Sequence, residues 1–145
     1  MNFILDIIQS LQLSRLTANN SFISRQVFLF RVNRHVLMSL ALSPEERKKS
    51  LSGSIVKIKY KLPSINLTSK KRLLLFDSIN SFADYGGMTS RFDTFRVGYF
   101  HFYEYNIQWQ VDYYFRGQIV DLLLIPVNEL DDICFIVTLT EYKEN

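Results

Sequence analysis

The chain has 145 residues, of which 48% are hydrophobic, 14% aromatic and 21% charged. This length suffices for one well-buried core and is short for two, and the composition argues against disorder and coiled coil. The single cysteine excludes an internal disulfide framework, and with only two histidines beside it a zinc-finger ligand set is excluded as well. No apolar run is long enough to cross a membrane, so we expect no membrane partner.

The net charge of +3 is unevenly distributed along the chain. Residues 1–72 hold 13 basic and three acidic side chains, a net charge of +10. Residues 73–145 hold four basic and 11 acidic side chains, a net charge of −7. Such an asymmetry indicates a polyanionic partner, or complementary surfaces within one molecule or across a homodimer.

The first 52 residues read as a mainly helical, basic segment. Hydrophobic residues at helical spacing predict one helix over residues 3–16 and a second over residues 22–42. Ser43-Pro44-Glu45-Glu46 predicts the start of a short third helix, because serine can cap it and proline suits its first position. Residues 1–13 lack the basic segment and the uninterrupted apolar run of a signal peptide, so we expect a cytoplasmic location.

Residues 54–62 read as a strand in which lysines alternate with apolar residues. At a period of two, Lys57, Lys59 and Lys61 share one face of the strand. This lysine row has three interpretations: a nucleic-acid contact, a solvated face that protects an edge strand, or a face that pairs with acidic groups of this molecule or of a partner.

The remaining residues predict a helix followed by strands. The helix runs over residues 68–82, with Leu73, Leu74, Phe76, Ile79 and Phe82 directed inward and Lys70, Lys71 and Arg72 outward. A turn at residues 84–87 precedes a hairpin of residues 94–103 and 107–115, joined through residues 104–106. A turn at Arg116-Gly117, a strand over 118–125 and a last strand over 133–142, with Cys134 fully buried, complete the chain.

This order predicts an α+β fold, with N-terminal helices packed on a mostly antiparallel sheet of three to five strands. We expect one domain over residues 1–145. Within it, residues 1–52 form the basic, mainly helical segment, and residues 53–145 supply a strand, a helix and the antiparallel sheet.

Aromatic residues are concentrated in residues 92–115, which hold 11 of them. Such rings can fill a core, stack on unpaired bases or anchor a protein interface. Because both faces of the predicted hairpin carry rings, we expect some of them at a partner-binding surface together with the basic residues. The predicted partner-binding residues are Arg47, Lys48, Lys49, Lys57, Lys59, Lys61, Tyr99, Phe100, Phe102, Tyr103, Tyr105, Trp109 and Tyr114.

Catalytic chemistry has only weak candidates. His101, Glu104 and Asp112 would have to meet across the hairpin to form a general acid–base pair. Arg91, Arg96 and Tyr85 would lie nearby. We expect neither a metal site nor a cofactor.

Four features carry a resemblance to a known family: Phe76 and Phe82 in the predicted helix, Gly98-Tyr-Phe100, Trp109-Gln-Val-Asp-Tyr-Tyr114 and Thr138-Leu-Thr-Glu-Tyr142. Through them residues 53–142 resemble an uncharacterised domain-of-unknown-function family carried on bacterial plasmids and phages. A polar turn of that family, with Asp-Pro, Gly-Glu-His and Asp-Phe-Gly elements, is replaced here by residues 86–93. The resemblance implies a mobile-element context and no mechanism.

Together these features predict a non-enzymatic binding protein, encoded by a phage or plasmid, that docks on a host protein complex and inhibits it, as anti-defence proteins of the anti-CRISPR type do. One alternative is a nucleic-acid-binding protein or a ribonuclease-type toxin that uses the lysine row with His101 or Tyr99. Another is a self-assembling protein whose basic and acidic halves pair between copies.

Overall fold

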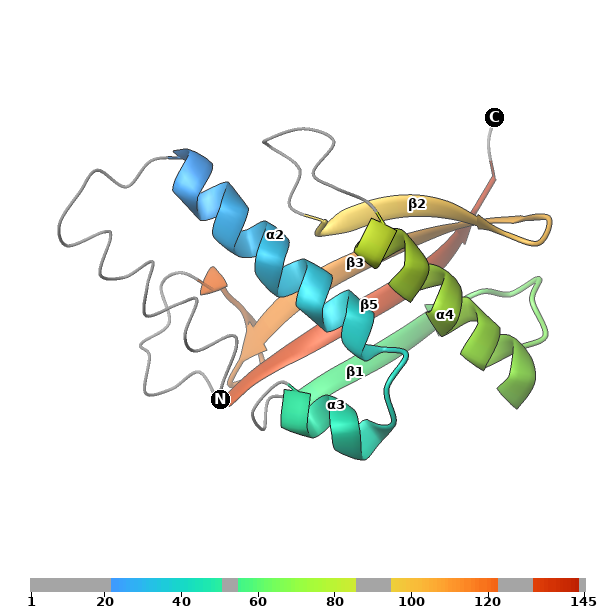
Figure 1. The fold of residues 1–145 in the computed structure, drawn as a ribbon, viewed down its shortest axis with the longest axis horizontal. Helices are drawn as coiled ribbons and strands as arrows, with labels where there is room; N and C mark the ends of the chain where they lie inside the picture. The colour runs from blue at the N-terminus through green and yellow to red at the C-terminus, as the bar shows by residue number, and fades with distance from the viewer. Residues whose placement is uncertain (1–21, 51–54, 86–94, 123–131, 144–145) are drawn as a thin grey trace, which may run out of the picture.

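The computed structural model describes residues 22–50, 55–85, 95–122 and 132–143. The predicted helix over residues 3–16, the residues 86–93, with Arg91 and Phe92 among them, and most of the segment after Leu122 lie outside these ranges. In chain order the elements are α2 (Phe22–Ser39), α3 (Pro44–Ser50), β1 (Ile55–Lys61), α4 (Ser69–Tyr85), β2 (Val97–Phe102), β3 (Tyr105–Phe115), β4 (Gln118–Ile119) and β5 (Ile133–Tyr142) (Figure 1).

Side-chain caps fix the starts of α3 and α4. The Glu46 amide donates to Ser43 Oγ over 3.2 Å, as the sequence predicted, and α3 begins at Pro44. Thr68 acts in the same way for α4, since its Oγ1 accepts a hydrogen bond of 3.2 Å from the Lys71 amide. The polar residues that flank these helices therefore set where they begin.

The inward face of α4 differs from the prediction. Leu75, Phe76 and Ile79 are buried, whereas Leu73 and Leu74 are 62% and 39% exposed. The buried stripe of α4 is thus shifted by about one residue from the predicted stripe. The reason is that α2 and the sheet, and not the helix alone, decide which side of α4 is buried. α4 also continues through residues 84 and 85, which the sequence had placed in a turn.

The sheet has five strands in the order β1-β5-β3-β2, with β4 paired to β3. All pairs are antiparallel except β1 with β5, which is parallel. The α+β class and the mostly antiparallel sheet are confirmed, and the sheet is mixed. The helices are not all N-terminal, because α4 lies between β1 and β2 in the chain.

Two tight turns join β3 to β2 and to β4. Tyr103 and Glu104 alone connect β2 to β3, so the turn begins one residue earlier than predicted and ends two residues earlier. Tyr103 has φ 54°. Arg116 and Gly117 join β3 to β4 with φ values of 52° and 80°, which is the backbone of a type I′ turn. The strand predicted over residues 118–125 is short, since β4 ends at Ile119.

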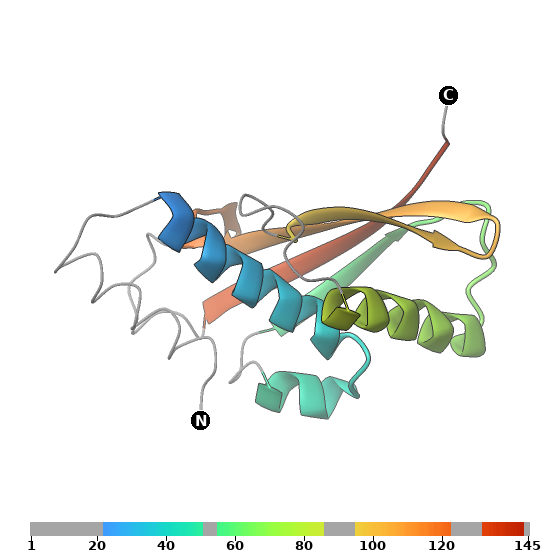
Figure 2. The ribbon, with the colours of Figure 1, turned by 45° about the horizontal axis from the view of Figure 1, so that its top comes forward.

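The core lies between one face of the sheet and the two long helices. Both α2 and α4 are on the same side of the sheet (Figure 2). Buried residues alternate along β5, with Ile133, Phe135, Val137 and Leu139 on the helix side. Cys134 has the opposite orientation and is only half-buried, so its predicted full burial is wrong.

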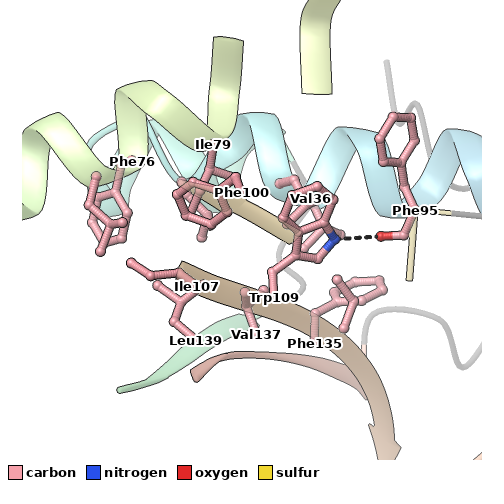
Figure 3. Close-up of a cluster of buried hydrophobic side chains, with 14 of the residues drawn as sticks. Val36, Phe76, Ile79, Phe95, Phe100, Ile107, Trp109, Phe135, Val137 and Leu139 are labelled. Carbon is pink, nitrogen blue, oxygen red and sulfur yellow. Dashed lines mark hydrogen bonds between the residues drawn. The ribbon is translucent and has the colours of Figure 1, made fainter. Parts of the chain in front are cut away.

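Trp109 of β3 occupies the centre of this core (Figure 3). Its Nε1 donates to the Phe95 carbonyl over 2.9 Å, which satisfies the one polar atom of a buried indole. Phe95 is buried although Tyr99, four residues later, is exposed, because its φ of 57° interrupts the strand alternation before β2 begins.

Candidate docking surface

The side of the sheet that faces away from α2 and α4 carries the lysine row. Lys57, Lys59 and Lys61 are all exposed, whereas Val56 and Ile58 on the other side of the strand are half-buried toward the core. Strand geometry places the first and last lysine about 13 Å apart. Within the described ranges of the chain, no carboxylate forms a salt bridge with any of the three. The row is therefore a positive charge without a counter-charge among these residues.

The register of the sheet extends each lysine into a row of side chains on the same face. Lys59 is paired with Thr138, which is paired with Gln110, and Gln110 with Val97. The next row runs from Lys61 across the sheet to Tyr99. Four strands at ordinary spacing span about 14 Å, so the lysines and the β2 residues form the two margins of one face. We call this face the open face.

The β2 margin of the open face carries rings. Tyr99 is 56% exposed, and its ring packs edge-on against Tyr142 at a centroid distance of 5.3 Å. His101, also exposed, follows on the same margin. The open face thus combines charge, hydrogen-bonding side chains and aromatic surface.

Arg96 and Asp112 form an ion pair on the open face. Arg96 Nη2 lies 2.9 Å from Asp112 Oδ1, and Gln110 Nε2 donates to both carboxylate oxygens of Asp112. Because Asp112 is paired with Arg96, its negative charge does not neutralise the lysine row.

Several predicted partner-binding aromatics are core residues. Phe100, Phe102 and Trp109 are at most 8% exposed, so their rings belong to the core and not to the open face. Five of the ten described rings in residues 95–115 belong to the core between sheet and helices: Phe95, Phe100, Phe102, Trp109 and Tyr113. Tyr103 at the hairpin turn is 66% exposed, and Tyr105 and Tyr114 are half-buried.

The basic residues of α3 are not part of the lysine row. Arg47 is half-buried, and its guanidinium donates to the carbonyls of Ser39 and Leu40 over 3.1 and 3.3 Å. It therefore caps the C-terminal end of α2. Lys49 is exposed, and the Lys48 side chain lies outside what the structure describes.

The weak catalytic candidates do not come together. His101 is paired with Asn106, and Asp112 lies six positions further along β3, about 20 Å away. Asp112 is held by Arg96 instead, and Glu104 lies in the exposed turn. The Tyr85 side chain is outside the described set, as is Arg91. No group of three or more metal-ligating side chains is found among the described residues.

Sequence reasoning missed the middle of the open face. Ile136, Thr138 and Thr140 read as an ordinary buried strand, and only the pairing of β5 with both β1 and β3 shows that they lie beside the lysines. The alternation of residues 133–142 was the available signal.

No helix in the described ranges is long and apolar enough to cross a membrane.

A comparison of the chain with protein-family models, with curated proteins and with solved structures finds no match.

Proposed function

We propose that this is a non-enzymatic binding protein whose open face docks on an acidic surface of another protein. The observation that carries the proposal is the exposed lysine row without a salt-bridge partner among the described residues. Three like charges on one strand repel each other, and an acidic partner surface would offset that repulsion. Long-range attraction would also speed the encounter between the two surfaces.

The surroundings of the lysine row favour a protein partner. Ile55 and Val97 are 55% and 41% exposed, so apolar side chains lie at the end of the lysine row and on the opposite margin of the open face. Protein interfaces combine apolar contact with a charged margin in this way, and tyrosines such as Tyr99 are frequent anchors in them.

The partner we propose is a host protein complex, and the sharpest form of the proposal is a defence nuclease that the protein inhibits. The support is the resemblance to a plasmid- and phage-borne family together with the surface chemistry above. In this setting the protein would work in the cytoplasm of the host cell.

A charge-reversal experiment tests the surface. The triple variant Lys57→Glu, Lys59→Glu, Lys61→Glu and a matched control with Lys49→Glu, Lys70→Glu, Lys143→Glu have the same net charge, and all six positions are exposed. Tagged proteins are used for affinity pull-down from the native host. We expect the partner recovered with wild type and with the control to be lost with the lysine-row variant. Equal recovery with all three proteins would remove the open face from the proposal.

Single-stranded nucleic acid is a second candidate, and the grouping of Tyr99, Tyr142 and His101 favours it. A base could stack on the exposed Tyr99 ring while phosphates contact the lysine row. A salt titration of a fluorescent oligonucleotide separates the two candidates, because nucleic-acid binding weakens steeply with salt concentration. Tight binding with that steep dependence would favour the nucleic acid, whereas no binding supports the protein partner.

A further inference from the structure

A groove lies between helix α4 and strand β2, at the edge of the sheet opposite to β1. It has a volume of about 850 Å³. One wall is β2 and its turn, residues 99–103, and the other is a stripe of α4 formed by Leu74, Asp77, Ser78 and Ser81. This groove is separate from the lysine row, which lies on the other margin of the sheet.

The outer edge of β2 has backbone groups available for another strand. The Val111 amide donates to the Arg96 carbonyl over 2.8 Å, and this bond fixes which residues of β2 point toward β3. By the alternation of an antiparallel pair, Val97, Tyr99 and His101 direct their backbone N–H and C=O groups away from β3. No strand within the described ranges pairs with that side.

The two edges of the sheet differ in how they are protected. Lysines on an edge strand such as β1 discourage pairing with further strands. β2 has the sequence VGYFHF and carries neither lysine nor carboxylate. Its edge is therefore the one that can accept an additional strand.

The groove beside this edge has a defined chemistry. Leu74 and Tyr103 are 39% and 66% exposed and contribute apolar surface. Asp77 is the one acidic side chain among the lining residues, and it is exposed; His101 is the one histidine among them. No salt bridge to it is found within the described ranges. A segment seated here would meet apolar surface, the carboxylate of Asp77 and the His101 residue.

We propose that this groove binds an extended peptide segment of another protein, which adds to β2 as a further strand. Alternate side chains of the segment are apolar and enter the groove, and a lysine or arginine among them reaches Asp77. Backbone hydrogen bonds supply affinity in this mode of recognition, and the groove supplies the choice of side chains. The site stands independently of the lysine row.

The side-chain preference is tested with a random peptide library displayed on phage and selected on the full chain. We expect enriched peptides with apolar residues at alternate positions and a basic residue at a fixed place among them. Selection on the Asp77→Lys variant should enrich acidic residues at that place. The substitution is on an exposed helix position, so folding should be retained.

The backbone contribution is tested with an enriched peptide and two variants at one position. Tyr99→Pro removes an N–H that points away from β3, whereas Tyr99→Ala keeps it. We expect the proline variant to lose about tenfold or more in affinity relative to the alanine variant, since it breaks a strand hydrogen bond and blocks the approach. Circular dichroism confirms that both variants are folded.

Three results would overturn the proposal. They are the absence of any enrichment, enrichment of the same peptides by wild type and Asp77→Lys, and equal affinity of the two Tyr99 variants. A wild-type dimer in light scattering that Tyr99→Pro dissociates would also overturn it, because the edge would then be occupied by a second copy. The lysine-row variant should bind the enriched peptides like wild type, whatever its effect on the proposed function.

Discussion

At the scale of single residues, Gly98 is required by the ring that lies over it. Gly98 is directly opposite Trp109 in the β2–β3 pair, and a Cβ at this position would lie 2.0 Å from a ring atom. We expect Gly98→Ala to lower the free energy of unfolding by about 1–3 kcal/mol, as overpacking does. Urea unfolding measures the loss. In a Trp109→Leu background the same substitution should cost much less, and an equal cost in both backgrounds would contradict the explanation.

Tyr113 gives the molecule a defined response to alkaline pH. Its ring is 6% exposed, and its hydroxyl donates to Asn33 Oδ1 of α2. Burial raises the pKa of Tyr113 well above its ordinary value, so the folded protein keeps the phenol neutral where the unfolded chain ionises. The contribution of Tyr113 to the free energy of unfolding is thus complete below about pH 10 and is lost as the pH rises further.

Replacing Tyr113 by phenylalanine should therefore have two effects. The free energy of unfolding at neutral pH should fall by about 1–2 kcal/mol, because a buried hydrogen bond is lost. The decline of stability above about pH 10 should become less steep than in wild type. Urea unfolding across the pH range measures both, with Tyr99→Phe at an exposed position as the control. Parallel alkaline declines in wild type and Tyr113→Phe would show that another group is responsible.

At the scale of elements, the connection between α2 and α3 depends on Arg47. Its guanidinium donates to Ser39, Leu40 and Leu42 carbonyls at the end of α2, from a position only three residues into α3. We expect Arg47→Ala to cost about 1–2 kcal/mol in unfolding free energy, less than for a fully buried charged donor. Arg47→Lys should recover only some of this, because an ammonium lacks the forked donor geometry. Thermal unfolding, with Lys49→Ala as control, measures this, and equal losses for Arg47→Ala and Lys49→Ala would contradict it.

The elements show what the sequence could predict. Local signals sufficed for the start of α3, where Ser43 and Pro44 act within one turn, and for the alternation of β1. They failed for Leu73 and Leu74, because an apolar stretch of α4 offers several possible stripes and its neighbours select one. The parallel pairing of β1 with β5 joins segments more than 70 residues apart, and no local pattern encodes it. The open face follows from that pairing, so only its lysine margin was predictable.

At the scale of the whole molecule, the basic and acidic halves of the sequence are not separate bodies. β1 from the basic half lies directly against β5 from the acidic half within one sheet. The fold instead divides the sheet into two faces. One face is covered by α2 and α4 (Figure 2), and the other bears the lysine row. Pairing of basic and acidic halves between copies is therefore not needed to bring these two segments together.

This arrangement predicts how stability responds to salt. Neighbouring lysines of the row are about 7 Å apart, which is within the screening length at 0.1 M salt and beyond it at 1 M. Their repulsion destabilises the fold, so the melting temperature should rise by about 2–4 °C between these concentrations. The variant Lys57→Gln, Lys59→Gln, Lys61→Gln should melt higher at low salt and respond less, whereas Lys49→Gln, Lys70→Gln, Lys143→Gln should behave like wild type. Identical salt responses in all three proteins would show that repulsion within the lysine row does not destabilise the fold. We expect a charged row that lowers the stability of the isolated protein where a binding surface is retained at a cost in stability.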